Sequence, residues 1–377
     1  MNYTDYLIPA GSSADKQGNF GDTVIKYQGE PDFEIPASVK VAIIGVPEDR
    51  FTDGAGEIKS PAAVRKQLYT LSNVSQRKVV DLGNLRVGKT LADTYYGLRD
   101  VLVELYQRNI AVLLIGGTID VFYGNYLAME GEEKNNLTSI SPQLRFPENH
   151  PMNALIFSMY GQGMPCPYHI CNLGYQSYYV QQQDLNYFSD HHFEAYRLGE
   201  VREGNMRESE PVIRDSDLLA ISMNAVKFSD APAASISSPN GFSGEEICQL
   251  AFFAGLSHRC RSLGIFDMIP QNDLQDITAK LTAQMAWYFI EGVLKRNLDN
   301  PEKDIQNFKK ILIYFEQLHH NLCFYKNMQT ERWWMEVPSL SGETGSLIIS
   351  CTQDDYVKAA EQEIPDRWWK TYQRINF

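Results

Sequence analysis

The sequence predicts an α/β fold with three layers, αβα, in which helices cover both faces of a mainly parallel sheet, and a small α+β appendage at the C-terminus. Short apolar runs alternate with longer amphipathic stretches before residue 298, a pattern typical of parallel sheets whose strands are buried on both faces. One such run ends in the pair Gly116-Gly117, which indicates a tight turn after a buried strand. A polar, proline-containing break at 298–304 then precedes a segment of different character.

The individual elements follow from local signals. Val41 to Val46 is an apolar run that predicts the first strand. Ser60 and Pro61 predict a helix that begins with a serine N-cap and a proline at its first position. Leu91 to Gln107 carries apolar residues at helical spacing and predicts a long helix. Further strands are expected at 79–83, 110–115, 138–141, 170–175, 218–223 and 263–268, and further helices at 245–263 and 278–295.

Three parts are expected along the chain: an irregular, polar and glycine-rich arm at 1–40, the α/β domain at 41–297, and an appendage at 298–377. In the appendage we expect strands at 322–325, 333–337 and 346–351 and a helix near 354–363. Two Arg-Trp-Trp triplets, at 332–334 and 367–369, either pack as cation–aromatic contacts that hold the appendage on the main domain or form an exposed anchor for a partner. Packing is favoured, because tryptophans are mostly buried.

Composition excludes several classes of function. With 377 residues and 44% hydrophobic content, the chain can bury one large core or a core with an added module. The net charge of -13 argues against nucleic acid as a partner. No apolar run approaches the length of a membrane span and the N-terminus lacks a signal-peptide pattern, so we expect no membrane partner and a cytoplasmic protein. The six cysteines are scattered, which favours buried free thiols.

Three segments, supported by landmarks outside them, carry a resemblance to a known family. The segments are 113–120 (Leu-Leu-Ile-Gly-Gly-Thr-Ile-Asp), 139–145 (Ser-Ile-Ser-Pro-Gln-Leu-Arg) and 221–224 (Ile-Ser-Met-Asn). The landmarks are the helix start at 60–65, the Asp-Leu-Gly-Asn of 81–84 and the Phe-Asp-Met-Ile-Pro of 266–270. In this order they resemble the ureohydrolases, the family of arginase, agmatinase and formimidoylglutamase. The nearest branch resembles formimidoylglutamase-like proteins with an extra C-terminal region. An arginase-like fold is therefore expected.

The resemblance also implies where a metal centre would lie. Active members of the family hold two manganese ions and a bridging hydroxide with aspartate and histidine ligands. The corresponding positions here are Ile119, Ser141, Gln143, Arg145, Ser222 and Asn224. Hard divalent ions favour carboxylate oxygen with some imidazole, and none of these side chains offers either group. We therefore expect a degenerate metal site with no metal, no cofactor and no catalytic residue.

Other polar residues are candidates for what remains of the pocket: Thr118, Asp120, Gln162, Asp230, Glu246 and Asp267. Arg145 either binds a small anion, because its guanidinium offers a fork of donors, or pairs with Asp120, Asp230 or Glu246. Glu246 lies near the family's acid that receives the substrate's cationic end, but it also suits a helix N-terminus. Gln162 corresponds to the histidine of the arginases' His-Gly-Met-Pro loop.

Two further clusters contain possible metal ligands. His191 and His192 lie between Asp190 and Glu194, and His319 adjoins His320. Adjacent histidines point apart on a helix, so we expect neither cluster to bind metal. No nucleotide-binding or serine-hydrolase motif is present in the sequence.

The leading hypothesis is a pseudoenzyme with the ureohydrolase fold that binds a small ligand or a protein. The alternative is a C–N hydrolase of a linear amidine, of the formimidoylglutamate, arginine or agmatine type, which acts through a relocated or metal-free site. Such a site would need Asp120, Asp230, Asp267 and Glu246 to come together. A third hypothesis is a structural subunit. The expected partners are a small anion and either further copies of the chain or a homologue, as the family's oligomeric habit implies.

Overall fold

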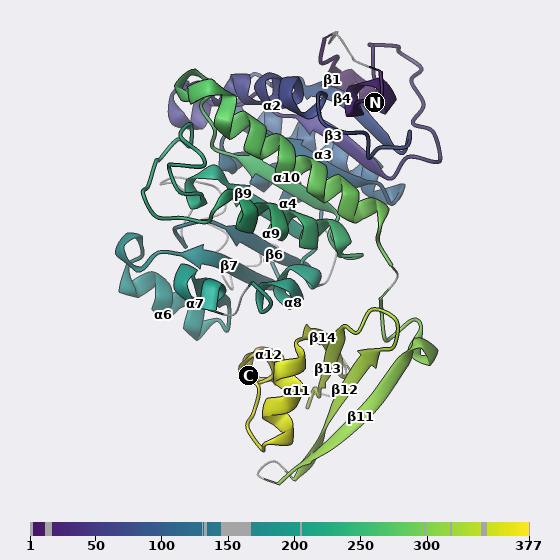
Figure 1. The fold of residues 1–377 in the computed structure, drawn as a ribbon, viewed down its shortest axis with the longest axis vertical. Coiled ribbons are helices and arrows are strands. Elements are labelled where there is room, and N and C mark those ends of the chain that lie inside the picture. Colours follow the sequence, from purple (N-terminus) through teal and green to yellow (C-terminus); the bar gives the residue numbers. More distant parts are fainter. Residues whose placement is uncertain are drawn as a thin grey trace.

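The protein is seen in a computed structural model that describes residues 3–11, 17–129, 131, 134–144, 167–203, 206–297, 299–316, 319–340 and 345–376. Its main domain is built on one large sheet with the strand order β1-β4-β3-β5-β10-β9-β6-β7-β8, and β2 also pairs with β4 (Figure 1). Apart from the antiparallel β1–β4 pair, all neighbours in this sheet are parallel. The strands are β1 Leu7–Ile8, β2 Ile25–Lys26, β3 Val41–Gly45, β4 Val79–Leu85, β5 Ala111–Ile115, β6 Asn136–Ile140, β7 His169–Tyr175, β8 Glu194–Arg197, β9 Leu218–Ser222 and β10 Ser262–Phe266.

The central strands are apolar on both faces because helices cover both faces. Every residue of β3, β5, β9 and β10 is buried. One face packs against α2 Ser60–Leu68, α7 Leu198–Glu203, α8 Ser209–Arg214, α9 Gly244–Leu256 and α10 Ile277–Leu294, together with the short α1 Phe20–Thr23. The other packs against α3 Leu91–Gln107, α4 Phe122–Leu127 and α6 Gln182–Asp190. Figure 1 shows α9 and α10 in front of the sheet and α3 and α4 behind it. The predicted three-layer arrangement is confirmed.

The C-terminal part forms a second, antiparallel sheet in simple chain order. Its strands are β11 Phe308–Phe315, β12 His320–Asn327, β13 Trp333–Val337 and β14 Leu347–Cys351. Two helices follow, α11 Gln353–Ala360 and α12 Asp366–Asn376, and they share a hydrophobic core with this sheet. The helical segments in the described part of the chain include none long and apolar enough to cross a membrane.

Several sequence predictions need correction. The arm at 1–40 is not wholly irregular, because β1 and β2 extend the sheet by pairing with β4. The helix expected at 245–263 ends at Leu256, since residues 257–261 turn back toward β10 and Ser257 Oγ accepts from the Arg259 amide. Ser60 is already helical, preceded by Lys59, and its hydroxyl donates to the Glu57 carbonyl. Strands β8 and β11 and helices α4, α6, α7, α8 and α12 were not predicted.

The two Arg-Trp-Trp triplets lie at the contact between the two parts. Trp333, Trp334 and Trp368 are buried, whereas Trp369 is 40% exposed. The cation that stacks on Trp334 comes from the main domain: the Arg214 guanidinium lies 4.2 Å from the ring centroid. Trp334 therefore packs as the packing interpretation expects, whereas Trp333 and Trp368 are buried in the core of the C-terminal part itself.

The triplet arginines themselves form ion pairs instead of stacking on their own tryptophans. Arg332 pairs with Asp299 and with Glu210 of α8. Arg367 pairs with Asp215, with 2.7 Å between Nη2 and Oδ2. These pairs bind the C-terminal part to α8 and the residue that follows it.

Candidate functional site

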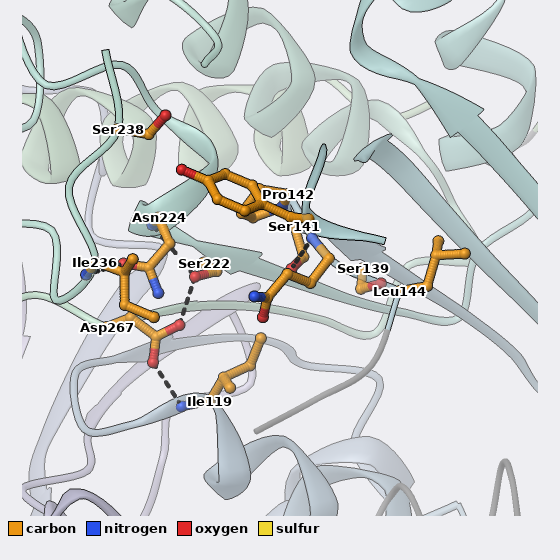
Figure 2. Close-up of a pocket in the computed structure, with 12 residues that line it drawn as sticks. Ile119, Ser139, Ser141, Pro142, Leu144, Ser222, Asn224, Ile236, Ser238 and Asp267 are labelled. Carbon is orange, nitrogen blue, oxygen red and sulfur yellow. Dashed lines mark hydrogen bonds between the residues drawn. The ribbon is translucent and has the colours of Figure 1, made fainter. Parts of the chain in front are cut away.

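A pocket opens at the carboxyl ends of β5, β6, β9 and β10, where the ends of parallel strands meet at one edge of the sheet (Figure 2). Its volume is about 600 Å³, part of which is open to solvent. It is lined by Ile119, Ser139, Ser141, Pro142, Gln143, Leu144, Tyr179, Ser222, Asn224, Ile236, Ser238 and Asp267. Five of the six residues at the expected metal-ligand positions are among them.

The Gly-Gly turn after β5 brings Ile119 to the pocket. Gly116 and Gly117 have φ values of +89° and +74°, which glycine adopts without strain. A Cβ on Gly116 would lie 2.3 Å from Ser60 Oγ, and one on Gly117 would lie 2.7 Å from the Val46 carbonyl oxygen. The turn therefore requires glycine at both positions, independently of any chemistry at Ile119.

Asp267 is the charged residue in the described lining, and its carboxylate is held by two donors. Its Oδ1 accepts from the Ile119 amide at 2.9 Å and its Oδ2 accepts from Ser222 Oγ at 2.5 Å (Figure 2). Burial raises the pKa of Asp267 to about 7 even though both hydrogen bonds oppose this shift. The backbone has a φ of +67°, which is uncommon for a non-glycine residue.

The segment after β6 contributes hydroxyl and amide groups. The backbone N–H of Gln143 donates to Ser141 Oγ at 3.2 Å. Asn172 of β7 donates to Ser139 Oγ and to the Gln143 carbonyl, at 3.0 and 3.1 Å. The turn of this segment is therefore fixed from the neighbouring strand.

Asn224 ties a loop to the pocket. Its Oδ1 accepts from the Ile236 amide at 2.7 Å and from Ser235 Oγ at 3.1 Å. The backbone N–H of Asn224 donates to Ser222 Oγ at 3.2 Å. The Asn224 carbonyl group is thus already engaged by the loop that brings Ile236 and Ser238 to the pocket wall.

Asp120 and Thr118 lie beside the pocket and not on its wall. The Asp120 carboxylate accepts from Tyr95 Oη at 2.6 Å and from the Thr118 hydroxyl. Burial raises the pKa of Asp120 to about 6, against the effect of both donors. Both residues are almost completely buried, so the expectation that they line the pocket is corrected.

Comparison with known proteins shows which fold the chain has. The chain is 24% identical over 251 residues to the formimidoylglutamase of Staphylococcus carnosus, which covers 62% of this chain and 79% of that protein. A formiminoglutamase structure from Trypanosoma cruzi, crystallised with manganese, superposes with a TM-score of 0.64 at 19% identity, covering 74% of this chain and 99% of the other. The chain has the ureohydrolase fold. It resembles the formimidoylglutamases within that fold, as the sequence predicts.

Two further solved ureohydrolase structures have the same fold as the chain. The Bacillus subtilis formimidoylglutamase has a TM-score of 0.64 at 17% identity, covering 78% of this chain and 98% of its own. The arginase of the same species has a TM-score of 0.56 at 16% identity, covering 69% and 99%. No profile of a known protein family matches the chain.

The described pocket residues do not fit the manganese pair of the ureohydrolase fold. Manganese is held mainly by carboxylate and imidazole groups. In the described lining the only such group is the Asp267 carboxylate, whose two oxygens already accept from Ser222 and Ile119. No group of three or more His, Cys, Asp or Glu side chains placed to hold a metal occurs among the described residues.

Asp230 and Glu246 are not among the residues that line this pocket, which corrects a second expectation. Glu246 caps α9 together with Ser243 and forms an ion pair with Arg202, with 3.0 Å between Nε and Oε1. Asp230 accepts from the Gly244 amide at 2.8 Å. Glu246 therefore acts at the start of a helix, the second of its two interpretations.

Arg145 and Gln162 lie outside the described residues. Among the described pocket residues, Tyr179, Ile236 and Ser238 were missed by sequence reasoning. They come from connecting segments that follow β7 and β9, and no motif marks them. Ser139, Pro142 and Leu144 belong to a segment that was recognised, but only its ligand positions were singled out.

The histidine pairs have ordinary contacts. The His191 ring stacks on Tyr187, with 4.0 Å between centroids, and its Nδ1 lies 2.9 Å from the Tyr187 carbonyl oxygen. Of the other pair, His319 lies near Tyr314 Oη. The described cysteines are Cys171, Cys248, Cys260, Cys323 and Cys351, all free and buried.

Proposed function

We propose that this ureohydrolase-fold protein is a pseudoenzyme that binds a small ligand in the pocket at the carboxyl ends of β5, β6, β9 and β10. One observation carries the proposal: five residues at the expected ligand positions line one pocket, and they contribute hydroxyl, amide and alkyl groups. Such groups recognise a small molecule by hydrogen bonds and shape, whereas a manganese pair needs several anionic ligands. The proposed role is therefore ligand binding without a metal ion.

The proposed ligand is a small anion, because the resemblance puts Arg145 at a former metal-ligand position and a guanidinium binds carboxylate oxygens with paired hydrogen bonds. The pKa of Asp267 bears on this, because an ionised carboxylate in the same pocket repels an anion and a protonated one donates to it. Anion binding is therefore expected to strengthen as the pH falls from 8 to 6. The glutamate and glutamine pair is a matched probe, since the two molecules have nearly the same size and differ in charge.

The first experiment is metal quantification on protein loaded with manganese at neutral pH, together with turnover assays on formimidoylglutamate, arginine and agmatine. The pseudoenzyme proposal expects no stoichiometric metal and no turnover. About two manganese ions per chain, as in two-metal hydrolases, would overturn it. Turnover without metal would instead support the alternative, a linear-amidine hydrolase with a relocated site.

The second experiment is calorimetric titration with glutamate and with glutamine at pH 6 and pH 8. Glutamate should bind more tightly at pH 6, and a Gln143→Ala variant should weaken that binding. A Glu246→Gln variant is the control, because Glu246 lies outside the pocket. Equal binding of both probes at both pH values would contradict the anionic ligand.

We further propose that the chain works in the cytoplasm and assembles with copies of itself or with a homologue. The resemblance to the ureohydrolases, whose members are often oligomeric, supports the assembly. Sedimentation of the purified protein would detect an assembly of identical copies. Copurification of a homologue with the chain would instead show a mixed assembly.

A further inference from the structure

Two neighbouring cavities lie at the amino ends of the strands, at the sheet edge opposite the pocket described above. The first, of about 1140 Å³ with its open mouth, is lined by residues that directly precede β5, β9 and β10 and by the connection after α10. The second, of about 790 Å³, lies between the starts of β6, β7 and β8 and the C-terminal elements β14 and α12. Arg259 and Glu302 belong to both linings.

The two linings are rich in positive charge. In the main domain and its following connection the cations are Lys134, Arg259, Arg261, Arg296 and Lys303, and α12 adds Arg367 and Arg374. The described carboxylates there are Glu194, Asp215, Asp217 and Glu302. Seven cations against four acids leave a local surplus of three positive charges, in a chain whose net charge is -13. A concave surface of opposite sign to the whole protein concentrates anions.

Three of the four acids in these cavities are engaged by donors, and the first two are Asp215 and Asp217. Asp215 accepts from the Ser350 amide at 2.9 Å and from Arg367 at 2.7 Å. Asp217 accepts from the Asn136 amide at 2.9 Å and from Arg259 at 3.0 Å. Each of these carboxylates is therefore shared between an arginine and a backbone amide. They do not neutralise the remaining arginines of the two linings.

Glu194 is engaged in the same way, and its partner His169 adds no charge. Glu194 accepts from Tyr196 Oη at 3.0 Å and lies 2.9 Å from His169 Nε2. Arg374 Nη1 lies 2.5 Å from His169 Nδ1, which makes Nδ1 the acceptor and places the ring proton on Nε2. Burial and the Arg374 cation lower the pKa of His169 to about 4, so the ring is neutral at neutral pH.

Several guanidinium donors remain without a hydrogen-bond partner among the described residues. They are Nη1 of Arg367, Nε of Arg374 and Nε of Arg367, all buried; the last lies 4.0 Å from Glu194 Oε1, an ion-pair distance that is too long for a hydrogen bond. A buried charged donor without a partner is costly, which favours a bound group that satisfies it. Both arginines belong to α12, and both line the second cavity.

We propose that this edge of the sheet is a binding site for a small, multiply charged oxyanion, which bridges the main domain and the C-terminal helix α12. Arginine forks bind phosphate and carboxylate oxygens with paired hydrogen bonds, and arginines come to this site from both parts of the chain. A multiply charged anion also matches the surplus of positive charge. The site is separate from the pocket at the carboxyl ends of the strands and does not depend on the function proposed for that pocket.

The test is calorimetric titration of the full chain with inorganic pyrophosphate at low ionic strength, with citrate as the carboxylate counterpart. The variants are Arg259→Gln, in both linings, and Lys303→Gln, an exposed residue whose loss leaves the core intact. Lys89→Gln is the matched control, because Lys89 is an exposed cation beyond the carboxyl end of β4, at the opposite sheet edge. Melting temperatures of all variants verify that they fold.

The wild type should bind with saturable heat. Arg259→Gln should weaken binding about tenfold and Lys303→Gln about threefold, whereas Lys89→Gln should leave it unchanged. Tighter binding of pyrophosphate than of citrate identifies a phosphate ligand, and the reverse order identifies a polycarboxylate. The proposal is overturned if neither anion binds the wild type, or if Lys89→Gln weakens binding as much as Lys303→Gln.

Discussion

Ser222 Oγ donates to Asp267 Oδ2 at 2.5 Å, from the last residue of β9 to the residue that follows β10. Phe266 and Ser222 are directly paired in the parallel ladder, so the strand register sets this contact. A residue at an expected metal-ligand position is therefore a hydrogen-bond donor to the one carboxylate of the described pocket wall. The pair makes the pocket sensitive to pH near neutrality, because the pKa of Asp267 is raised to about 7.

Asp267→Asn should stabilise the protein at alkaline pH. The folded-state pKa of about 7 lies above the ordinary 3.8, so between these values the folded state keeps a proton that the unfolded state has lost. The stability of the wild type therefore falls as the pH rises from about 4 to 7. The variant's gain in the free energy of unfolding over the wild type should be roughly 1–3 kcal/mol larger at pH 8 than at pH 5.

Denaturant unfolding of both proteins at several pH values measures this difference. Asp230→Asn is the control, because donors that include the Gly244 amide lower the pKa of Asp230 despite the effect of burial. Its stabilising effect is complete above pH 4, so the cost of its removal should not change between pH 5 and pH 8. A difference for Asp267→Asn that stays constant over this range would contradict the raised pKa.

Sequence patterns predicted the central strands well because those strands are buried on both faces. Val41–Gly45, Ala111–Ile115 and Leu218–Ser222 are almost entirely apolar, and no other element fits such short runs between glycine or proline signals. The helix at Leu91–Gln107 was found with its bounds because its apolar residues recur at helical spacing, and the structure adds a capping box of Thr90 and Asp93 at its start. Local chemistry was sufficient for these elements.

The pocket and the C-terminal contact depend on long-range neighbours, and the sequence could predict them only in part. The resemblance predicted that Ile119, Ser222 and Asn224 lie close together, because the segments that contain them follow the same order along the chain as in the ureohydrolases. Nothing local shows that Glu246 turns toward Arg202, 44 positions away, rather than into the pocket. Likewise, the stacking of Arg214 on Trp334 depends on how two separate cores pack together.

Arg367→Leu should strongly destabilise the contact between the main domain and the C-terminal part. Its removal leaves the carboxylates of Asp215 and Glu194 in a poorly solvated place without their cation. Arg367 and His169 hold the pKa of Glu194 well below its ordinary value, against the effect of burial. We expect a loss of about 3–5 kcal/mol in the free energy of unfolding.

The matched change is Arg197→Leu. Arg197 and Glu200 are both about half exposed, at 51% and 50%, and their charged atoms are 4.0 Å apart. Such a surface pair contributes less than about 1 kcal/mol. Urea unfolding of the two variants would contradict the role of Arg367 if both lose the same small amount.

Trp368→Ala and Trp369→Ala form an internal comparison between neighbouring tryptophans. The Trp368 side chain is 2% exposed and its Nε1 donates to the Glu336 carbonyl at 2.9 Å, whereas Trp369 is 40% exposed. Removal of Trp368 should cost about 3–5 kcal/mol, since it opens a cavity in the C-terminal core. Removal of Trp369 should cost roughly 1 kcal/mol or less.

Thermal unfolding followed by tryptophan fluorescence and circular dichroism checks this pair. If Trp369→Ala destabilises the protein as much as Trp368→Ala, then Trp369 is buried in solution by an assembly contact. That outcome would contradict the assignment of Trp368 alone to the core.

Restoring the ligand types that the ureohydrolase resemblance expects should create manganese binding. The substitutions are Ile119→His, Ser141→Asp, Gln143→His, Arg145→Asp, Ser222→Asp and Asn224→Asp. Without metal this variant gathers carboxylates near Asp267, and their repulsion should lower its stability below that of the wild type. Manganese should then raise its melting temperature, because an ion bound only by the folded state stabilises that state.

The wild type should show no manganese-dependent rise in melting temperature, since its described pocket offers a single carboxylate. A variant with only Ile119→His and Ser222→Asp should respond weakly, because two new ligands cannot hold a pair of ions. If the wild type responds as strongly as the sixfold variant, its metal ligands lie elsewhere and the assignment of these six positions is wrong. If the sixfold variant folds but does not respond, the pocket geometry differs from that of the metal-binding ureohydrolases in the backbone as well as in the side chains.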